Sequence, residues 1–568
     1  MLGGRYTRRK RQRHKPKPNP NPNNGENAET DTCKGLSFAD CELAILRMAV
    51  DKAENKMGKR AVESGDIKKI IAIVEDFIKA KSVICYGGTA INNILPEKDK
   101  FYDKDVELPD YDFLSLHAVE DAKELADIYF NKGFTEVEAK AGQHHGTFKV
   151  FVNYFAVADI TFMPKSIFDV LKKEALRVDG ILYAPPNFLR MSMYLELSRP
   201  AGDTSRWEKV MKRLSLLNKN YPITNVNCYD VDFQRGMSAA TGPAAAAATH
   251  HLTKTEEHKI FEVTLQTLVR EKVVFFGGYA NLLYSRYMPA KFKHKLSKET
   301  ADFDVLSNSP KETAEKVKAS LLQQKSLFAT DRGSKGQVKI VQHTAIGEIV
   351  PEHYEVQIGG ESILFIYKPV GCHSYNTLEI DGKTVRVATI DTMLSFYLAF
   401  LYADKPYYNQ FTNRILCMSK FLFDVQQKNR LSQKGLLKRF SITCYGHQES
   451  VEEMKAKKAK KYRELSAPGK KNSPEYEEWF LNYKPSDGAA VAAALKHRTK
   501  ESSAEISKTR VLSSTQRRQP SATAAIASST AATTETAKTR KRPTQKKTQK
   551  RGKRRHVAKK PKWYKLLL

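Results

Sequence analysis

Asp110 and Asp112 are the two side chains whose spacing most directly indicates chemistry. They lie in the segment PDYDFLS (109–115), which has the character of a β-strand, and side chains two residues apart on a strand point to the same face. Two carboxylates on one face repel each other in a protein interior, and a divalent cation is the usual remedy. We therefore predict that both aspartates are metal ligands with a catalytic role.

Asp159 is a third candidate, because it is the single carboxylate in the apolar run FAVADITF (155–162). Taken alone, such an acid has three explanations: an ion pair, a hydrogen-bonded core carboxylate or a metal ligand. Beside Asp110 and Asp112 the ligand interpretation leads, and we expect all three on adjacent strands, holding two Mg²⁺ ions. Two such ions activate an attacking hydroxyl and stabilise a phosphate and its leaving group. Asp159 is then expected on the hydroxyl side, as a ligand and a proton acceptor.

A glycine pair upstream of the aspartates predicts where phosphates bind. The apolar segment 83–86 ends at Gly87 and Gly88, and we expect a helix to begin at Thr89. Backbone N–H groups and the positive end of the helix dipole suit a triphosphate. We therefore assign Gly87, Gly88 and Thr89 to nucleotide binding.

A later helix carries several cations on about two turns, among them Arg206, Lys209, Lys212 and Arg213. Two interpretations stay open for these side chains, a solvated helix face or contact with phosphate. Arg206 and Lys209 are the candidates that we assign to nucleotide binding.

The motif around the glycine pair occurs twice. VVFFGGYAN (273–281) repeats VICYGGTAI (83–91), and ADFDVLS (301–307) repeats PDYDFLS (109–115). Two motifs that recur in the same order at nearly one offset indicate a duplicated domain.

The second copy differs from the first at the third carboxylate. Counting back from the next proline aligns Leu364 with Asp159, so the second copy lacks this acid. We expect it to bind catalytic metal poorly and to serve as a packing partner or a nucleic-acid platform. The alternative is that Glu355 or Glu361 takes the place of the missing ligand.

The net charge of +32 lies mostly at the two ends of the chain. Residues 1–24 contain eight Lys or Arg and no acid, and residues 491–568 contain 22 Lys or Arg against three Glu. Neither end has enough apolar residues to form a core, so both are predicted to be disordered. Such polycations bind polyanions by releasing counterions. A solubilising leader, a nuclear localisation signal and a packaging tail are the alternatives.

The seven cysteines show no CxxC pair and no zinc-ligand spacing, so we expect free thiols in a reducing compartment. The longest apolar run, around residues 393–402, is too short to span a bilayer. We therefore expect a soluble intracellular protein with no membrane partner.

The glycine pair, the Asp110-x-Asp112 motif and the distant Asp159 together resemble the nucleotidyltransferase superfamily related to DNA polymerase β. The fuller segments YGGTAINNILPEKDKFYDKDVELPDYDFLS and SRPAGDTSRWEKVMKRLSLL resemble the poly(A) polymerase catalytic subunits of large nucleocytoplasmic DNA viruses. This resemblance covers about residues 37–430. One departure is the long charged insert 96–109 before the aspartates, to which we assign no role.

The resemblance implies a template-independent transferase that adds AMP from ATP to RNA 3′ ends in mRNA polyadenylation, with Mg²⁺ or Mn²⁺ as cofactor. It carries Gly87 and Gly88 over as the phosphate turn and Asp110, Asp112 and Asp159 over as metal ligands. RNA 3′ ends and ATP are the implied partners, and a homodimer or a viral processivity partner is compatible with it. The implied location is the host cytoplasm (viral factory) and the virion, and the basic tail leaves the nucleus open.

Other functions stay open, because three aspartates do not specify a base. CCA addition, uridylation and oligoadenylate synthesis use the same chemistry, and a non-catalytic RNA-binding subunit is the alternative from another class.

The predicted fold is α+β, with duplicated polymerase β-like nucleotidyltransferase domains, each a mixed sheet with helices, plus helical segments and disordered basic tails. The predicted parts are a basic arm (1–36), a catalytic domain with helical flanks (37–235), a linker (236–252), a degenerate second domain (253–430), a helical segment (431–485) and a basic tail (486–568).

Overall fold

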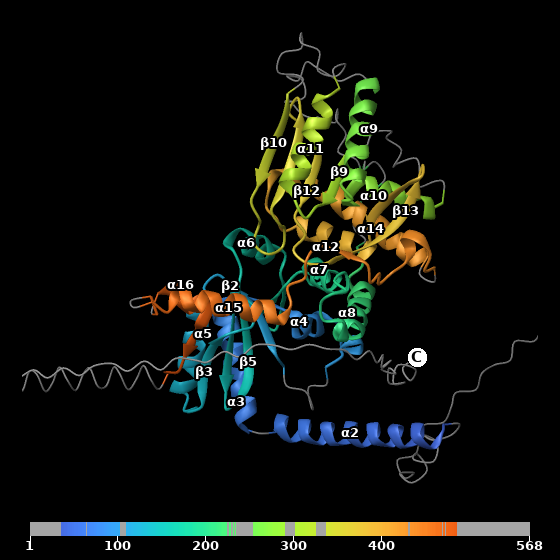
Figure 1. The fold of residues 1–568 in the computed structure, drawn as a ribbon. Coiled ribbons are helices and arrows are strands. Elements are labelled where there is room, and N and C mark those ends of the chain that lie inside the picture. Colours follow the sequence, from blue (N-terminus) through green and yellow to red (C-terminus); the bar gives the residue numbers. More distant parts are fainter. Residues whose placement is uncertain are drawn as a thin grey trace, which may run out of the picture. The chain divides into compact units, whose positions relative to one another are not determined.

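The structure, a computed structural model, describes residues 36–63, 65–102, 109–223, 227–228, 231, 233, 254–289, 302–324, 337–409, 411–429, 432–467, 470–471 and 473–485 (Figure 1). All of them belong to one compact unit within residues 1–494. The predicted basic arm, except for its last residue, the linker 236–252 and the tail 486–568 lie outside the described residues, as do residues 103–108 of the charged insert.

The first half of the chain forms a mixed sheet with the strand order β16-β3-β4-β5-β2-β1-β7-β6. Its central pair, β2 and β5, is parallel, whereas β1 and β2 are antiparallel. The strands are β1 (Ile84–Tyr86), β2 (Tyr111–Ser115), β3 (Val137–Ala141), β4 (Thr147–Val152), β5 (Phe155–Phe162), β6 (Leu176–Val178), β7 (Ile181–Tyr183) and β16 (Asn482–Tyr483).

Helices cover this sheet because their apolar residues recur at helical spacing. The helix α3, for example, buries Ile70, Val74 and Phe77 along one face and leaves its lysines in water. The helices of this half are α2 (Phe38–Glu63), α3 (Gly65–Lys81), α4 (Gly87–Ile94), α5 (Ala118–Asn131), α6 (Lys165–Glu174), α7 (Pro186–Leu197) and α8 (Trp207–Asn220).

The second half forms another mixed sheet, with the order β10-β11-β12-β9-β8-β14-β13-β15 (Figure 1). Seven of its strands follow the order and the directions of β3-β4-β5-β2-β1-β7-β6 in the first sheet. The strands are β8 (Val274–Phe276), β9 (Phe303–Leu306), β10 (Val338–His343), β11 (His353–Ile358), β12 (Glu361–Tyr367), β13 (His373–Ile380), β14 (Lys383–Ala388) and β15 (Cys444–Tyr445). The predicted α+β class with two similar mixed sheets is therefore confirmed, whereas the exact domain boundaries stay a prediction.

The helices of the second half are α9 (Lys254–Arg270), α10 (Gly277–Tyr284), α11 (Pro310–Leu322), α12 (Ile390–Phe400), α13 (Pro406–Asn409), α14 (Thr412–Lys428), α15 (Val451–Leu465) and α16 (Pro474–Phe480). Every residue of α12 is buried, which explains its nearly continuous apolar sequence. The segment predicted to be helical at 431–485 contains α15 and α16, and it also supplies the short strands β15 and β16, one to each sheet.

Two disulfides correct the expectation of free thiols. Cys228 is bonded to Cys417 and Cys372 to Cys444, and Cys41 is also disulfide-bonded. Sequence spacing could not reveal these pairs, because their members lie 189 and 72 residues apart. Cys85 is the buried free thiol of the described part of the chain.

None of the described helices combines the length and the apolar character that crossing a membrane requires.

Candidate active site

Four neighbouring strands bring the predicted carboxylates into one row. In the sheet register Lys149 of β4 lies beside Asp159 of β5, Asp159 beside Asp112 of β2, and Asp112 beside Tyr86 of β1. Side chains at paired positions point to the same face of a sheet. Asp110 comes one residue before β2 and two residues before Asp112, so its side chain points to the same face as that of Asp112. The three aspartates thus meet on one face, as their strand pattern predicts.

The charges of this row act on one another. Burial raises the pKa of the Asp112 carboxyl to about 7, and the negative charges of Asp110 and Asp159 add to this effect. The pKa of Asp110 is raised as well, first by burial and then by the charge on Asp159. Without a cation this face therefore disfavours full ionisation.

Lys149 supplies one positive charge, through an ion pair between its Nζ and Asp159 Oδ2. The other oxygen, Asp159 Oδ1, is buried and has no hydrogen-bond partner within the described residues. Of the three explanations for an acid in this strand, the ion pair is therefore realised. Among the described residues no group of three or more His, Cys, Asp and Glu side chains is gathered closely enough to hold a metal ion.

The residues nevertheless fit a hard divalent cation. Carboxylate oxygens are the ligands that Mg²⁺ and Mn²⁺ prefer, and one lysine cannot balance three carboxylates. Within the described residues Asp159 Oδ1 is free to act as a ligand, and a cation would offset the burial and the neighbouring negative charges that raise the pKa of Asp112.

Gly87 lets the backbone approach this row closely. Its φ of +74° lies in the left-handed region, and a Cβ atom built on it would overlap Asp112 Oδ2. The helix α4 begins at Gly87 rather than at the predicted Thr89. The buried Thr89 hydroxyl donates to the backbone carbonyl of Asp110 at 2.7 Å, so Thr89 holds the start of β2 in place.

Gly88 faces a guanidinium. A Cβ atom at Gly88 would lie 2.5 Å from Tyr102 Oη and 2.9 Å from Arg213 Nη1. Arg213 donates from Nη2 to Tyr102 Oη at 2.6 Å, and its guanidinium lies over the rings of Phe101 and Tyr102. Arg213 therefore stands directly beside the N-terminal turn of α4.

The two cations predicted for nucleotide binding differ in their surroundings. Arg206 is exposed, forms an ion pair with Glu196 (Nε–Oε1, 3.2 Å), and its charge lowers the pKa of Asp112. Lys209 is exposed and makes no hydrogen bond or ion pair with any described residue. Arg213 is not among the residues assigned to nucleotide binding from sequence, although it follows Arg206 by seven residues, about two helical turns.

The second copy keeps the glycine and the aspartates but not the third acid. Asp304 pairs in register with Phe365, so Phe365 rather than Leu364 occupies the place of Asp159. The alignment counted from the following proline is wrong by one residue, because Phe365 lies four residues before Pro369 whereas Asp159 lies five residues before Pro164. Gly277, with φ +68°, approaches Asp304 as Gly87 approaches Asp112.

Glu355 does not replace the missing ligand. It lies on β11 beside Phe365, the position that Lys149 holds in the first copy. Burial raises the pKa of Glu355, but hydrogen bonds from His343, Ser362 and Gln357 outweigh burial and lower it to about 2. Its oxygens are thus already used by these three side chains.

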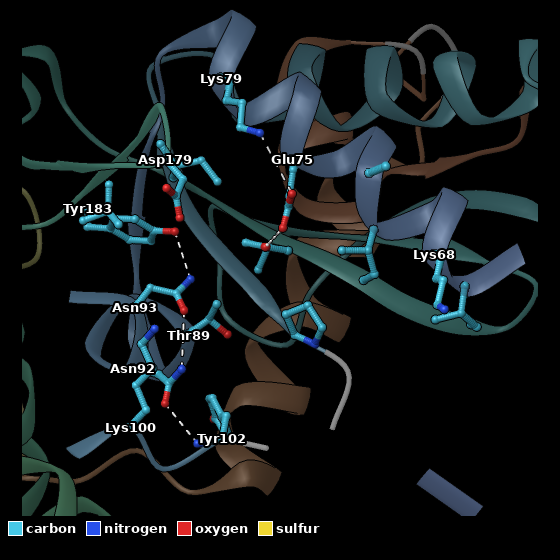
Figure 2. A pocket seen from close by; sticks show the side chains of 17 residues that line it. Lys68, Glu75, Lys79, Thr89, Asn92, Asn93, Lys100, Tyr102, Asp179 and Tyr183 are labelled. Atoms are coloured by element: carbon cyan, nitrogen blue, oxygen red, sulfur yellow. Dashed lines mark hydrogen bonds and ion pairs between the residues drawn. The ribbon is translucent and has the colours of Figure 1, made fainter. Parts of the chain in front are cut away.

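A cavity of about 480 Å³ opens on the other side of β2 (Figure 2). Tyr111 lines it, and Tyr111 points away from the face that carries Asp110 and Asp112. Asn93 donates to Tyr183 Oη across this cavity at 2.9 Å, and Lys79 lies near Glu75 (Figure 2). Because none of the three aspartates lines it, this cavity is not the candidate active site.

The two similar mixed sheets, the glycine turn at a helix start and the aspartates on neighbouring strands define an α+β fold with the arrangement that the resemblance to polymerase β-like nucleotidyltransferases implies. Residues 72–203, which contain all three aspartates, match the family model of the poly(A) polymerase catalytic subunit. This match agrees with the resemblance inferred from the sequence over this segment.

Similar proteins come from large DNA viruses. A putative poly(A) polymerase catalytic subunit of Acanthamoeba polyphaga mimivirus is 33% identical over 183 residues, which are 32% of this chain and 30% of that protein. A putative poly(A) polymerase catalytic subunit of African swine fever virus (isolate Pig/Kenya/KEN-50/1950) is 33% identical over 171 residues, which are 29% of this chain and 36% of that protein. The aligned part spans about a third of each relative.

A solved structure extends the likeness of the fold over most of the chain. The crystal structure of the Megavirus polyadenylate synthase superposes with a TM-score of 0.63 and covers 86% of this chain and 92% of that chain. At 18% sequence identity this likeness shows the fold.

Proposed function

We propose that the protein is a poly(A) polymerase, which transfers AMP from ATP to the 3′ hydroxyl of RNA without a template and releases pyrophosphate. The observation that carries the proposal is the row of Asp110, Asp112 and Asp159 beside the Gly87 turn, inside the segment that matches the catalytic-subunit family. The names of the viral relatives support the same reaction.

In this proposal Asp110, Asp112 and Asp159 hold Mg²⁺ or Mn²⁺. When bound, the divalent cations neutralise the carboxylates and the phosphate and make the RNA hydroxyl more acidic. Asp159 accepts the proton of that hydroxyl, because its Oδ1 has no other partner among the described residues. Lys149 pairs with Asp159 Oδ2 and keeps this side chain on the face of the row.

The triphosphate is assigned to the start of α4. There the first backbone N–H groups of the helix and its positive dipole end lie beside the Arg213 guanidinium. Phe101 and Tyr102 hold this guanidinium in position, and an arginine fork matches two phosphate oxygens. Arg206 adds charge next to Asp112, and the exposed Lys209 contributes only at longer range.

The direct test is incorporation of each labelled nucleoside triphosphate into an RNA primer with Mg²⁺ or Mn²⁺. We expect strong preference for ATP and growth of the primer at its 3′ end. Equal use of all four nucleotides would contradict a poly(A) polymerase and favour another terminal transferase. No incorporation with any nucleotide, together with retained RNA binding, would favour a non-catalytic RNA-binding subunit.

A further inference from the structure

Arg199, two residues after the end of α7, is a cation in an unusual environment. Its Nε is buried and has no hydrogen-bond acceptor among the described residues. Its guanidinium makes no ion pair with a described carboxylate. Burial lowers the pKa of Arg199, and the charge of Glu348 opposes this effect. A buried cation without a partner is costly to a folded protein unless a ligand compensates it.

The immediate neighbours of Arg199 do not neutralise it. A Cβ atom at Gly371 would lie 2.8 Å from Arg199 Nε and 2.8 Å from Gln448 Oε1. His373 is fully buried, and both of its ring nitrogens lack partners in the described structure. The Ser374 amide donates to the Ser198 carbonyl at 2.8 Å, which fixes the backbone beside Arg199. None of these three neighbours, Gly371, Gln448 and His373, carries a negative charge that would balance Arg199.

A structural arginine in the same protein looks different. Arg190, on α7, is 1% exposed, and its guanidinium donates to Asn187, to Asn218 and to the Tyr221 carbonyl. Those three acceptors satisfy its donors within the chain. Arg199 has no such set of acceptors, so packing alone does not account for it.

A cavity connects Glu348 with the hydroxyl side of the candidate active site. Glu348 and Thr161 both line this cavity of about 430 Å³, and the charge of Glu348 acts on Arg199. Tyr86 Oη lies 2.9 Å from Thr161 Oγ1, and Thr161 follows Asp159 by two residues on β5. Arg213 and the start of α4, in contrast, serve the side assigned to the triphosphate.

We propose that Arg199 binds a phosphodiester group of the RNA strand whose 3′ end reaches Asp159. This inference rests on the proposed function and names the contact that holds its RNA substrate. The phosphodiester supplies the negative charge that Arg199 lacks, and Glu348 competes with it for the guanidinium. Glu348 thereby keeps the affinity for RNA moderate, as suits a strand that must move by one nucleotide after each transfer.

The test compares Arg199→Met and Glu348→Gln with the unmodified full-length protein. Binding of a fluorescent RNA oligonucleotide is measured by anisotropy, without ATP or divalent metal, over a series of salt concentrations. We expect Arg199→Met to weaken RNA binding by about tenfold and to reduce the salt slope by about 0.7, the value for one single-strand phosphate. Glu348→Gln should strengthen binding. Arg177→Met, at the exposed end of the sheet on β6, is the matched control and should leave both quantities unchanged.

A folding measurement separates a binding role from a structural one. Arg199→Met should leave the midpoint of thermal unfolding unchanged or raise it, because it removes an uncompensated buried charge. Arg190→Met should lower the midpoint, because it leaves three acceptors without a donor. A lowered midpoint for Arg199→Met that Arg199→Lys restores would show a structural role and overturn the inference.

Two further outcomes keep this inference apart from the proposed function. Unchanged RNA affinity and salt slope in Arg199→Met, or a raised KM for ATP alone, would overturn the RNA contact even if AMP transfer is observed. Loss of RNA affinity in Arg199→Met would support the contact even if the unmodified protein transfers no nucleotide.

Discussion

At the scale of single residues, the decisive difference between the two copies is one position on the third strand. Asp159 meets Asp112 in the first sheet, and Phe365 meets Asp304 in the second. An aromatic ring supplies no metal ligand, so only the first copy presents three carboxylates to one face. In the proposed function, this single exchange assigns the chemistry to the first copy.

Replacing Asp112 by Asn tests that assignment. We expect AMP transfer to fall by at least about 10³-fold, since a cation loses a charged ligand. The midpoint of thermal unfolding without metal should stay the same or rise, because the change removes charge repulsion in a buried cluster. Single-turnover transfer and calorimetry measure both effects. Asp304→Asn is the matched control, and a loss of transfer in this variant would show that the wrong copy was chosen.

The residues of the row were predictable from sequence, but their partners were not. Asp110, Asp112 and Asp159 stand out because acids are rare in strands with apolar alternation. Lys149 and Arg213 join them only through strand pairing and helix packing, which no local pattern encodes. Phe365 could be identified only from the sheet register, because its distance to the next proline is one residue shorter than that of Asp159, so that counting from the proline selects Leu364.

At the scale of elements, the strand, glycine turn and helix form a unit that both copies keep. Gly87 and Gly277 have similar positive φ angles, and each brings the backbone against an aspartate of the next strand. The unit therefore has a structural role in both copies and, in the proposed function, a chemical role in the first.

Matched substitutions of the two glycines separate these roles. Gly87→Ala and Gly277→Ala should each destabilise the protein by at least about 1 kcal/mol, because alanine disfavours this backbone and its Cβ meets a carboxylate. Only Gly87→Ala should also displace Asp112 and strongly reduce AMP transfer. Denaturant unfolding and transfer assays give the comparison. Equal loss of transfer in both variants, at temperatures where both are folded, would contradict it.

Long helices with periodic apolar residues can be predicted from the sequence, whereas strands of two residues cannot. Helices such as α3 and α5 follow directly from the spacing of their apolar residues. The strands β15 and β16 have two residues each, and nothing in CY or NY distinguishes them from a loop. Only the edge of an existing sheet makes them strands.

At the scale of the whole molecule, buried groups that join the two halves should control stability in acid. His373 begins β13, packs at 5.2 Å from the ring of Phe396 on α12, and lies near Arg199 from the first half. Burial, with the charge of Arg199, lowers the pKa of His373 to about 3. The unfolded chain takes up this proton near pH 6.5 and the folded chain does not.

The free energy of unfolding should therefore fall as the pH falls from about 6.5 towards 3. His373 should contribute up to about 1.4 kcal/mol per pH unit to this fall. His373→Gln should remove this share of the slope, measured as the free energy of unfolding in urea between pH 6.5 and 5. The exposed His447→Gln is the control and should keep the slope. An unchanged slope in His373→Gln would show that this histidine is not buried in its neutral form.

The disulfide between Cys228 and Cys417 should also stabilise the molecule, because it closes a loop of 189 residues. Chain-entropy arguments give a loss of up to about 5 kcal/mol when such a cross-link is removed. Cys417→Ser should lower the midpoint of thermal unfolding, and a reducing agent should then have a smaller further effect than on the unmodified protein. Identical midpoints for the variant and the oxidised protein would show that this bond does not contribute.

The last described strand, β16, returns to the first sheet. It pairs with β3, Tyr483 Oη donates to Asp127 Oδ1 at 2.7 Å, and Lys123 forms an ion pair with Glu477 of α16. In the sequence, the second copy is thus inserted between the other strands of the first sheet and β16, the edge strand of that sheet. A fragment cut at the linker would leave β3 as an uncovered edge that can pair with other chains. Dissecting the two copies therefore requires a circularly rearranged chain in which residues 450–485 stay joined to the first sheet.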